Sequence, residues 1–330
     1  MNKHQPYDLK QMQSVPLEGK IIMTQQRIRQ WYEHWDGLVY VSFSGGKDST
    51  VLKHIVDEMY DDVPAVFVNT GLEYPEIQKF AKEQKNVVVV RPEMRFDEVL
   101  KKYGYPVVSK MVAHNVRIAK RNPQGKVMKN VFNPDNTGMF GAYKWKFLTG
   151  ATFDTSEECC NVMKKKPLKE YTKKTERRPF LGTMACESKL RYTKWLQNGC
   201  NLFDDKSPVS QPLSFWTEQD ILLYLKKYNV PYCSVYGDIV YTDTNGAEYD
   251  TSFFEDGQLK TTGCDRTGCI FCMFGCHLEK EPNRFQRLKE THPRQYEYCI
   301  SGGELVDGKW QPSKDGLGLG YVLDFIGVKY

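Results

Sequence analysis

The sequence contains no run of about 18 consecutive apolar residues, the length that a membrane-spanning helix needs. Its first residues, MNKHQPYDLKQMQSVPLEGK, lack the apolar core of a secretory signal. Internal repeats and low-complexity tracts are also absent. These absences predict a cytosolic globular protein without a membrane partner. In that compartment the ten cysteines are expected to be reduced thiols, metal ligands or catalytic groups, and not a framework of disulfides.

Neither sign of charge dominates the chain, because 46 Lys and Arg residues stand against 41 Asp and Glu, for a net charge of +5. So mild an excess permits a phosphate-rich partner without requiring one. Four basic stretches occupy residues 119–129, 143–147, 164–167 and 173–178, and the second is interleaved with aromatic residues. Taken singly, each is better explained as a solvated charged face. Taken together, they make a nucleic-acid acceptor a candidate partner.

Short apolar runs alternate with helical patterns along the first part of the chain. Strands are expected at 38–43, 63–69 and 86–92, and helices follow them at 51–60, 74–84 and 95–104. A further strand at 179–185 precedes a helix at 186–197, and Thr217 is the expected N-cap of another helix. Continuous apolar strands that alternate with helices are typical of an α/β fold, a parallel twisted sheet with helices on both faces.

The same pattern predicts three parts of the chain. Residues 1–36 form a helical lead-in, residues 37–235 form the α/β domain with a basic insertion at about 109–175, and residues 236–330 form a cysteine-rich C-terminal region. In this last region Asn245-Gly246 and Asp307-Gly308 are expected to be the turns of two small hairpins.

The first strand runs into the string SGGKDST, which predicts a strand, a glycine turn and a helix start. Glycines let the backbone approach a ligand closely, and successive N–H groups at a helix N-terminus attract an anion. Lys47 adds a mobile positive charge, and Asp48 either caps the helix or helps to hold a metal bound to phosphates. The spacing is that of neither a Walker A loop nor a dinucleotide G-x-G-x-x-G loop. The turn therefore predicts a phosphate site of another kind.

Four ordered motifs resemble a known family. FSGGKDS resembles the PP-loop of the ATP pyrophosphatase superfamily. VFVNTGLEYPEI, LGTMACESKLR and PLSFWTEQDILLYLKKYNVPY resemble three segments of the phosphoadenosine phosphosulfate (PAPS) reductase family. The chain departs from the family pattern at Asn69, where Asp is usual, and at Met184, where Arg is frequent. The resemblance implies a Rossmann-like sheet that binds ATP and Mg²⁺, with chemistry at the α-phosphate.

The resemblance also implies a set of site residues. Lys47 and Asp48 are the expected catalytic pair. The residues expected to contact the nucleotide are Ser42, Ser44, Gly45, Gly46, Lys47, Asp48, Ser49, Thr70, Gly71, Glu187, Ser188 and Arg191. Glu187 and Ser188 could instead cap the helix that begins beside them.

The cysteines suggest a metal site. Cys159 and Cys160 are adjacent, a pair that suits one small zinc ion poorly, because four sulfurs would have to converge at about 2.3 Å from it. A cubane cluster holds its thiolates farther apart. The arrangement is similar to the Cys-Cys…Cys-x-x-Cys pattern that binds a [4Fe-4S] cluster in adenosine 5′-phosphosulfate (APS) reductases, which implies Cys159, Cys160, Cys269 and Cys272 as ligands. The alternative is a self-contained site, for zinc or a cluster, formed by Cys264, Cys269, Cys272 and Cys276.

The sequence lacks a catalytic cysteine that the resemblance would imply, and this narrows the choice of reaction. The APS and PAPS reductases carry a nucleophilic cysteine near the C-terminus, and no cysteine follows Cys299 here. The complete PP-loop favours true ATP use, so we expect adenylylation of an acceptor with release of pyrophosphate, followed by sulfur transfer. This resembles the iron–sulfur PP-loop enzymes of DNA phosphorothioation and tRNA thiolation. A sulfur-donor protein and a homo-oligomer are further expected partners. The alternatives are an APS/PAPS-type reductase that releases sulfite, and a non-catalytic nucleotide-binding protein with a structural metal site.

Overall fold

The computed structural model describes residues 2–138, 141–203, 206–243, 248–249 and 257–330. Within these ranges, no helix is both long and apolar enough to cross a membrane. The chain forms two compact units, and each draws on separate stretches of sequence. The first unit contains residues 1–69, 73–91 and 168–267, and the second contains residues 70–72, 92–167 and 268–330.

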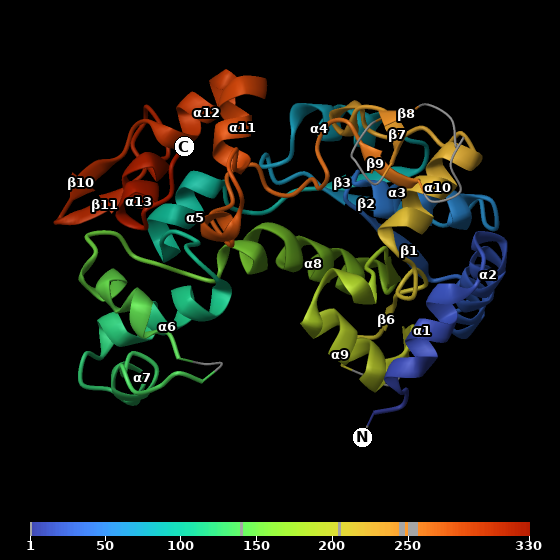
Figure 1. Cartoon of the computed structure of the whole chain (residues 1–330), viewed down its shortest axis with the longest axis horizontal. Helices are drawn as coiled ribbons and strands as arrows, with labels where there is room; N and C mark the ends of the chain where they lie inside the picture. Colours follow the sequence, from blue (N-terminus) through green and yellow to red (C-terminus); the bar gives the residue numbers. More distant parts are fainter. Residues whose placement is uncertain (1, 139–140, 204–205, 244–247, 250–256) are drawn as a thin grey trace. The chain divides into compact units, whose positions relative to one another are not determined.

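The first unit is built on a six-stranded sheet in the order β3-β2-β1-β4-β6-β5 (Figure 1). Its strands are β1 (Val39–Phe43), β2 (Ala65–Val68), β3 (Val87–Val90), β4 (Arg178–Leu181), β5 (Asn201–Leu202) and β6 (Val209–Ser210). Strand β1 lies between β2 and β4, with Val41 opposite Ala65 and Phe180, and these pairings are parallel. Among the described residues of this sheet, antiparallel pairing is confined to β5 and β6. The expected parallel α/β sheet is confirmed.

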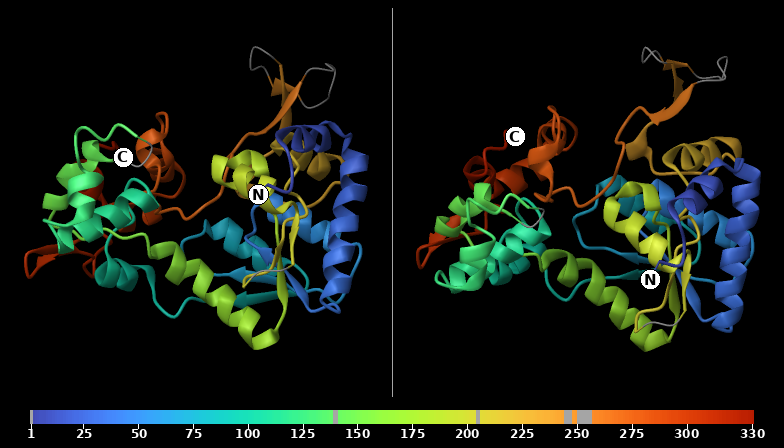
Figure 2. Two further views of the ribbon diagram at one scale, coloured as in Figure 1. Left: turned by 90° about the horizontal axis from the view of Figure 1, so that it is seen from below. Right: turned by 60° about the horizontal axis from the view of Figure 1, so that its bottom comes forward.

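Helices cover both faces of this sheet. Neighbouring side chains of a strand point to opposite faces of the sheet. The contacts of two residues of β1 show which helix covers each face. Tyr40 contacts α8 (Lys166–Thr175), since its hydroxyl lies 3.2 Å from that of Thr172. Phe43 faces the other way, and its ring lies 6.3 Å from that of Phe80 in α4 (Pro75–Glu83). Figure 2 shows the green α8 alongside the blue and cyan strands.

The remaining helices and small strands of the first unit complete its core. Lys20 in the second helix binds both carboxylate oxygens of Asp220, at 2.8 and 2.7 Å. Thr217 caps its helix as expected, because its side chain accepts a hydrogen bond from the N–H of Asp220. The remaining helices and strands of the first unit are α1 (Pro6–Ser14), α2 (Leu17–His34), α3 (Lys47–Asp57), α9 (Lys189–Asn198), α10 (Glu218–Lys227), the 3₁₀ turns η3 (Ala185–Glu187) and η4 (Ser234–Tyr236), and strands β7 (Ile239–Thr242), β8 (Glu248–Tyr249) and β9 (Gln258–Thr261).

The second unit is mostly helical. It contains α5 (Phe96–Tyr103), α6 (Lys110–Arg121), α7 (Lys126–Asn130), the 3₁₀ helix η1 (Tyr143–Gly150), a π-helical turn (Asn161–Lys165), the 3₁₀ turn η5 (Cys276–Leu278), α11 (Arg284–Thr291), α12 (Pro293–Ile300), α13 (Leu319–Phe325) and the strands β10 (Glu304–Val306) and β11 (Lys309–Gln311). Buried rings hold it together: Phe153 packs edge-on against Tyr105, whose hydroxyl donates to the carbonyl of Leu317 at 2.9 Å.

Both expected hairpin regions contain antiparallel strands. β10 pairs with β11 around Asp307 and Gly308, which both have positive φ, so that hairpin is confirmed. β7 pairs antiparallel with β8 and β9. The expected turn at Asn245-Gly246 lies outside the described residues.

Candidate functional site

The glycine turn after β1 collects backbone N–H groups around a small set of hydroxyl oxygens. Gly45 has φ +73°, a conformation that L side chains rarely adopt, and a Cβ there would lie 2.9 Å from Ile77. The N–H of Ser44 donates to the hydroxyl of Ser49 at 3.2 Å, and the N–H of Gly46 donates to the hydroxyl of Ser44 at 3.3 Å. The turn therefore ends with its N–H groups converging at the start of α3, as an anion site requires.

Two hydroxyls from distant residues cover the first turn of α3. The N–H of Lys47 donates to the hydroxyl of Tyr236 at 3.2 Å, and that hydroxyl lies 2.6 Å from the hydroxyl of Thr267. A Cβ on Gly46 would lie 3.3 Å from the first oxygen and 3.4 Å from the second. Burial raises the pKa of Tyr236 to about 12, so the phenol stays neutral. Neutral hydroxyl oxygens thus occupy the position where a helix N-terminus attracts phosphate oxygens.

Lys47 is buried and surrounded by oxygen atoms. Its ammonium group forms an ion pair with Glu218 at 2.9 Å and donates to the carbonyl of Asp265. It also lies 5.3 Å from the centre of the Tyr236 ring. Glu218 is more than half exposed, so solvent screens this pair and a phosphate could replace the carboxylate.

Asp48 lies beside Lys47 and has an unsatisfied oxygen. Its Oδ1 is buried and has no hydrogen-bond partner among the described residues. Burial raises the pKa of its carboxyl, Lys47 opposes that effect, and Glu218 adds to it. A buried carboxylate oxygen without a partner costs stability. This oxygen fits a divalent cation, because oxygen is the donor that Mg²⁺ prefers.

The segment after β4 lies within electrostatic range of Asp48. Ser188 caps α9, with its hydroxyl 3.3 Å from the N–H of Arg191, so the capping role is confirmed. Glu187 accepts from the N–H of Met184 at 2.8 Å, forms an ion pair with Arg191, and binds Arg266 at 2.6 Å. The charges of Arg191 and Arg266 both lower the pKa of Asp48. Two arginines and one lysine therefore surround a single loop, which favours an anionic ligand.

The other expected nucleotide contacts are placed differently. Ser42 is a half-buried residue inside β1. Thr70 and Gly71 belong to the second compact unit, where the hydroxyl of Thr70 accepts from the N–H of Leu72 at 3.1 Å and Gly71 has φ +75°. Their role, like that of the loop residues, stays a prediction.

The four expected ligand thiols all belong to the second unit and influence one another. Burial, then the charges of Cys269, Cys160 and Cys272, raise the pKa of Cys159. Burial is also the main cause of the raised pKa of Cys272, and Cys160 contributes. Two chain segments more than a hundred residues apart thus bring their thiols within electrostatic range. All ten cysteines lie within the described ranges, and none of them forms a disulfide there.

Local backbone structure explains how the thiols are presented. Cys159 and Cys160 begin the helical run that passes through the π-helical turn into α8. A helix N-terminus favours thiolate over thiol, but at Cys159 burial outweighs this effect and the pKa is raised. On the other segment, the N–H of Gly275 donates to the carbonyl of Val108 at 2.9 Å. Val108 has φ +60°, an outlier for a β-branched residue, and such strain is concentrated at functional sites.

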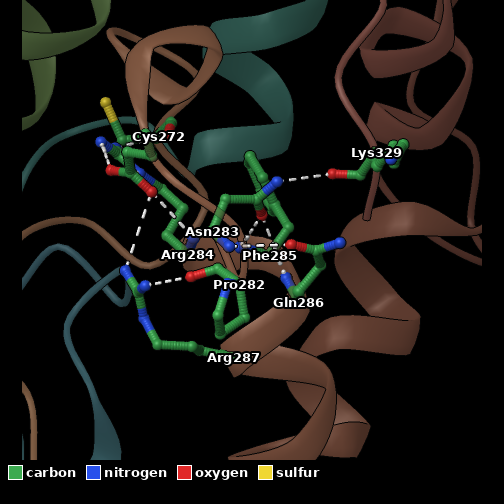
Figure 3. Close-up of polar contacts among 9 residues, drawn as sticks. Cys272, Pro282, Asn283, Arg284, Phe285, Gln286, Arg287 and Lys329 are labelled. Atoms are coloured by element: carbon green, nitrogen blue, oxygen red, sulfur yellow. Dashed lines mark hydrogen bonds and ion pairs between the residues drawn. The ribbon is translucent and has the colours of Figure 1, made fainter.

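Positive charges accompany the thiols. Lys164 lowers the pKa of both Cys159 and Cys272, although burial dominates each. Arg284 donates to the carbonyl of Cys272 at 2.8 Å (Figure 3). It also forms an ion pair with Glu279. Asn283 caps α11 and donates to the carbonyl of Lys329 at 2.7 Å, which fixes the segment that carries Arg284. Such cations would offset the negative charge of several thiolates.

The two outer cysteines of the same segment differ from each other in their surroundings. Cys276 is buried, donates to the carbonyl of Met273 at 3.1 Å, and has a pKa that burial, with smaller contributions from Glu279 and Cys272, raises to about 11. Cys264 belongs to the first unit, where its charge acts on Cys233. Within the described ranges, no group of three or more His, Cys, Asp and Glu side chains stands ready to hold a metal ion. The ligand set therefore stays a prediction, supported by the effects of Cys269, Cys160 and Cys272 on the pKa of the buried Cys159.

Sequence reasoning missed five residues around the loop: Glu218, Tyr236, Asp265, Arg266 and Thr267. Tyr236 follows the Pro-Tyr end of the PLSFWTEQDI motif, and the last three lie between Cys264 and Cys269. Because those neighbours are cysteines, the segment suggests metal binding alone. Its basic and hydroxyl residues were the available signal for a phosphate contact.

Comparison with known families gives a match over most of the chain. The model of the phosphoadenosine phosphosulfate reductase domain matches residues 38–131 and 87–274. This range includes the glycine loop, the segment after β4, and the cysteines from Cys159 to Cys272.

Individual relatives are distant. The chain is 25% identical over 307 residues to the uncharacterised protein MJ0973 of Methanocaldococcus jannaschii, across 86% of this chain and 54% of that protein. The chain spans about half the length of the curated relatives that it matches. Phosphoadenylyl-sulfate reductase from Candida auris, in complex with phosphate, is 14% identical with a TM-score of 0.37, over 64% of this chain and 82% of that one.

The U34-tRNA thiolase NcsA of Methanococcus maripaludis, solved with its [4Fe-4S] cluster, is 18% identical with a TM-score of 0.34. That match covers 65% of this chain and 66% of the thiolase. Scores this low add nothing to what the chain's own sheet already shows about its fold.

Proposed function

Because the chain belongs to the phosphoadenosine phosphosulfate reductase domain family, we propose that it uses ATP to adenylylate an acceptor for sulfur transfer. An oxygen of the acceptor attacks the α-phosphorus of ATP, and the bond to pyrophosphate breaks. A sulfur nucleophile then attacks the activated carbon, its bond to oxygen breaks, and AMP leaves. Pyrophosphate and AMP are the products that such a sequence must release.

The observation that carries this proposal is the anion site at the start of α3. The N–H of Lys47 is directed at a hydroxyl oxygen 3.2 Å away, in the position that a phosphate oxygen would take. The ammonium group of the same residue would exchange Glu218 for the β- and γ-phosphates. Positioned donors of this kind stabilise a leaving pyrophosphate, because charge grows on its oxygens in the transition state.

Asp48 would hold Mg²⁺ through its unpartnered Oδ1. The cation would supply charge neutralisation of the phosphates. Arg191 and Arg266, which form ion pairs with Glu187, would bind the remaining anionic groups of the nucleotide or the acceptor.

The thiols of Cys159, Cys160, Cys269 and Cys272 would hold a [4Fe-4S] cluster in the second unit. The charges of Cys269, Cys160 and Cys272 raise the pKa of Cys159 after burial does, whereas Cys264 acts on Cys233 in the first unit; this supports the ligand set over the one with Cys264 and Cys276. Such a cluster would supply sulfur binding or structural stability when present. A sulfur-donor protein would then be a partner.

The test is release of pyrophosphate from ATP and Mg²⁺, measured with a coupled assay on protein purified without oxygen. Lys47→Ala is expected to reduce turnover by roughly 100-fold or more, the scale seen when one preorganised donor to a developing charge is removed. Lys79→Ala is the matched control, because that lysine lies in the same unit and is 78% exposed. Equal turnover by wild type and Lys47→Ala would contradict the proposal, as would ATP binding without any pyrophosphate.

A sulfonucleotide reductase is the second candidate, and one observation favours it. The Cys186 residue is exposed, and its thiol pKa is raised chiefly by partial burial and less by the charge of Asp48, so this thiol lies near the loop. Cys299 is fully buried with a pKa far above normal, which makes it a poor nucleophile. Release of sulfite from APS or PAPS, abolished in Cys186→Ser, would establish this function in place of the first.

A further inference from the structure

We propose that the face formed by α6, α7 and η1 binds single-stranded nucleic acid. Naming this ligand as the acceptor rests on the proposed function, but the surface itself does not. Residues 110–150 contain six lysines and two arginines against a single acid, Asp135. This stretch therefore carries more positive charge than the +5 of the whole chain. A concentration of charge on one face is the electrostatic signature of a phosphate-rich partner.

Most of these cations are free to contact a ligand. Arg117 forms an ion pair with Glu157, and Lys120 donates to the carbonyls of Ala151 at 2.9 Å and Phe153 at 2.7 Å, so both serve the fold. The other six are exposed and have no acidic partner within the described ranges: Lys110, Arg121, Lys126, Lys129, Lys144 and Lys146.

Aromatic rings lie between the lysines of η1. Tyr143 is 47% exposed and Phe147 is 46% exposed, values that leave ring surface open to a base. The ammonium group of Lys144 lies 5.3 Å from the centre of the Trp145 ring, and that of Lys146 lies 5.7 Å from the centre of the Tyr143 ring. Rings alternating with cations suit a single strand, whose unpaired bases stack while its phosphates bind lysine.

The rest of the unit holds these rings in place. Trp145 packs edge-on against His277, with ring centres 5.0 Å apart. Phe147 lies 5.7 Å from Phe325 of α13, and Leu148 is fully buried. η1 packs against α6, which in turn packs against α7, and Figure 1 labels these two green helices. The exposed lysines and rings thus lie on three elements that pack in series within the second unit.

The surface chemistry favours nucleic acid over an anionic membrane or an acidic protein. α6 buries the apolar residues Val112, Ala113, Val116 and Ala119, so it offers no apolar stripe to lipid. An acidic protein would satisfy the lysines but would make no use of the exposed rings. A nucleic-acid strand uses both.

The test is binding of fluorescein-labelled 20-nucleotide RNA and DNA single strands, and of the matching duplex, by fluorescence anisotropy without ATP. Wild type is expected to bind single strands more tightly than duplex. Lys144→Ala/Lys146→Ala is expected to lower the slope of log Kd against log salt by about 1.4, since each phosphate contact on a single strand contributes about 0.7. Tyr143→Ala is expected to weaken binding by about fivefold or more at all salt concentrations, through lost stacking.

The matched control is Lys101→Ala/Lys102→Ala, an adjacent exposed pair in α5 of the same unit. It removes the same charge and is expected to change the salt slope little. Equal effects of the two double variants would overturn the proposal, because net charge alone would then explain binding. Binding to anionic vesicles or polyglutamate, but not to oligonucleotides, would overturn it too. Oligonucleotide binding without ATP turnover would instead contradict the proposed function while leaving this surface intact.

Discussion

The buried carboxyl of Asp48 is expected both to lower the stability of the folded protein and to bind a cation. Its carboxyl has a raised pKa, chiefly because of burial, so ionisation is less favourable in the folded protein than in the unfolded chain. The folded state therefore binds the proton more tightly, and stability falls as pH rises from the ordinary value of 3.8 through the raised pKa. At neutral pH a charged and partly desolvated oxygen remains, which a cation would satisfy.

This cost predicts the behaviour of Asp48→Asn. The variant cannot ionise, so its Tm is expected to exceed that of wild type at neutral pH, and the difference is expected to vanish below pH 3.8. Differential scanning fluorimetry across the pH range measures the Tm of wild type and of the variant. Mg²⁺ with ATP is expected to raise the Tm of wild type alone. A Tm difference that is constant across the pH range would show that the substitution acts through packing and not through charge.

At the scale of elements, the ion pair of Arg284 and Glu279 fixes the loop that carries Cys272. The guanidinium group also donates to the carbonyl of Cys272 at 2.8 Å. Arg284→Met keeps the apolar stem but removes these contacts, and it is expected to lower the free energy of unfolding by about 1–2 kcal/mol. We expect a loss in the lower part of the usual range for hydrogen bonds to charged groups, because the side chains of Arg284 and Glu279 are each about a quarter exposed. In addition, Arg287 still lies 3.7 Å from Glu279.

The matched control for this pair is nearby in the same unit. Lys329 and Glu281 form an ion pair at 3.1 Å, but the lysine is 75% exposed. Lys329→Met is therefore expected to change stability by less than about 0.5 kcal/mol. Urea unfolding followed by tryptophan fluorescence compares the two variants. Equal losses would mean that the contact with Cys272 contributes nothing measurable.

The strands of the sheet could be predicted because each is a short, continuous apolar run. Val39 to Phe43 is buried almost throughout, so no alternative pattern competes with it. The helix α6 gave a weaker signal, since two of its four buried residues are alanines. The 3₁₀ helix η1 gave no sequence signal, because exposed rings and lysines alternate along it and its position depends on contacts with His277 and Phe325.

The loop residues could be predicted as well, because SGGKDST is a local signal. Its covering residues could not be predicted, since Tyr236 reaches Lys47 across 189 positions of sequence and Thr267 in turn contacts Tyr236. Only the resemblance to the APS reductases predicted that the four thiols would lie together. No local pattern places Cys159 within range of Cys269.

At the scale of the whole molecule, each compact unit is assembled from separated stretches of the chain. The second unit combines residues 92–167 with residues 268–330. The thiols of Cys159 and Cys160 belong to the first stretch, and those of Cys269 and Cys272 to the second. A metal group held by all four would cross-link the two stretches, and its binding free energy would then stabilise this unit.

This cross-link predicts which cysteines matter for metal content. Cys159→Ser is expected to lose most of the iron and the broad visible absorbance of protein purified without oxygen, and to lower the Tm. Cys264→Ser, the matched control, is expected to keep all three, because that cysteine belongs to the first unit. Both variants are expected to bind ATP alike, since the glycine loop is part of the first unit. Iron retained in Cys159→Ser but lost in Cys264→Ser would instead assign the metal to the closed site of Cys264, Cys269, Cys272 and Cys276.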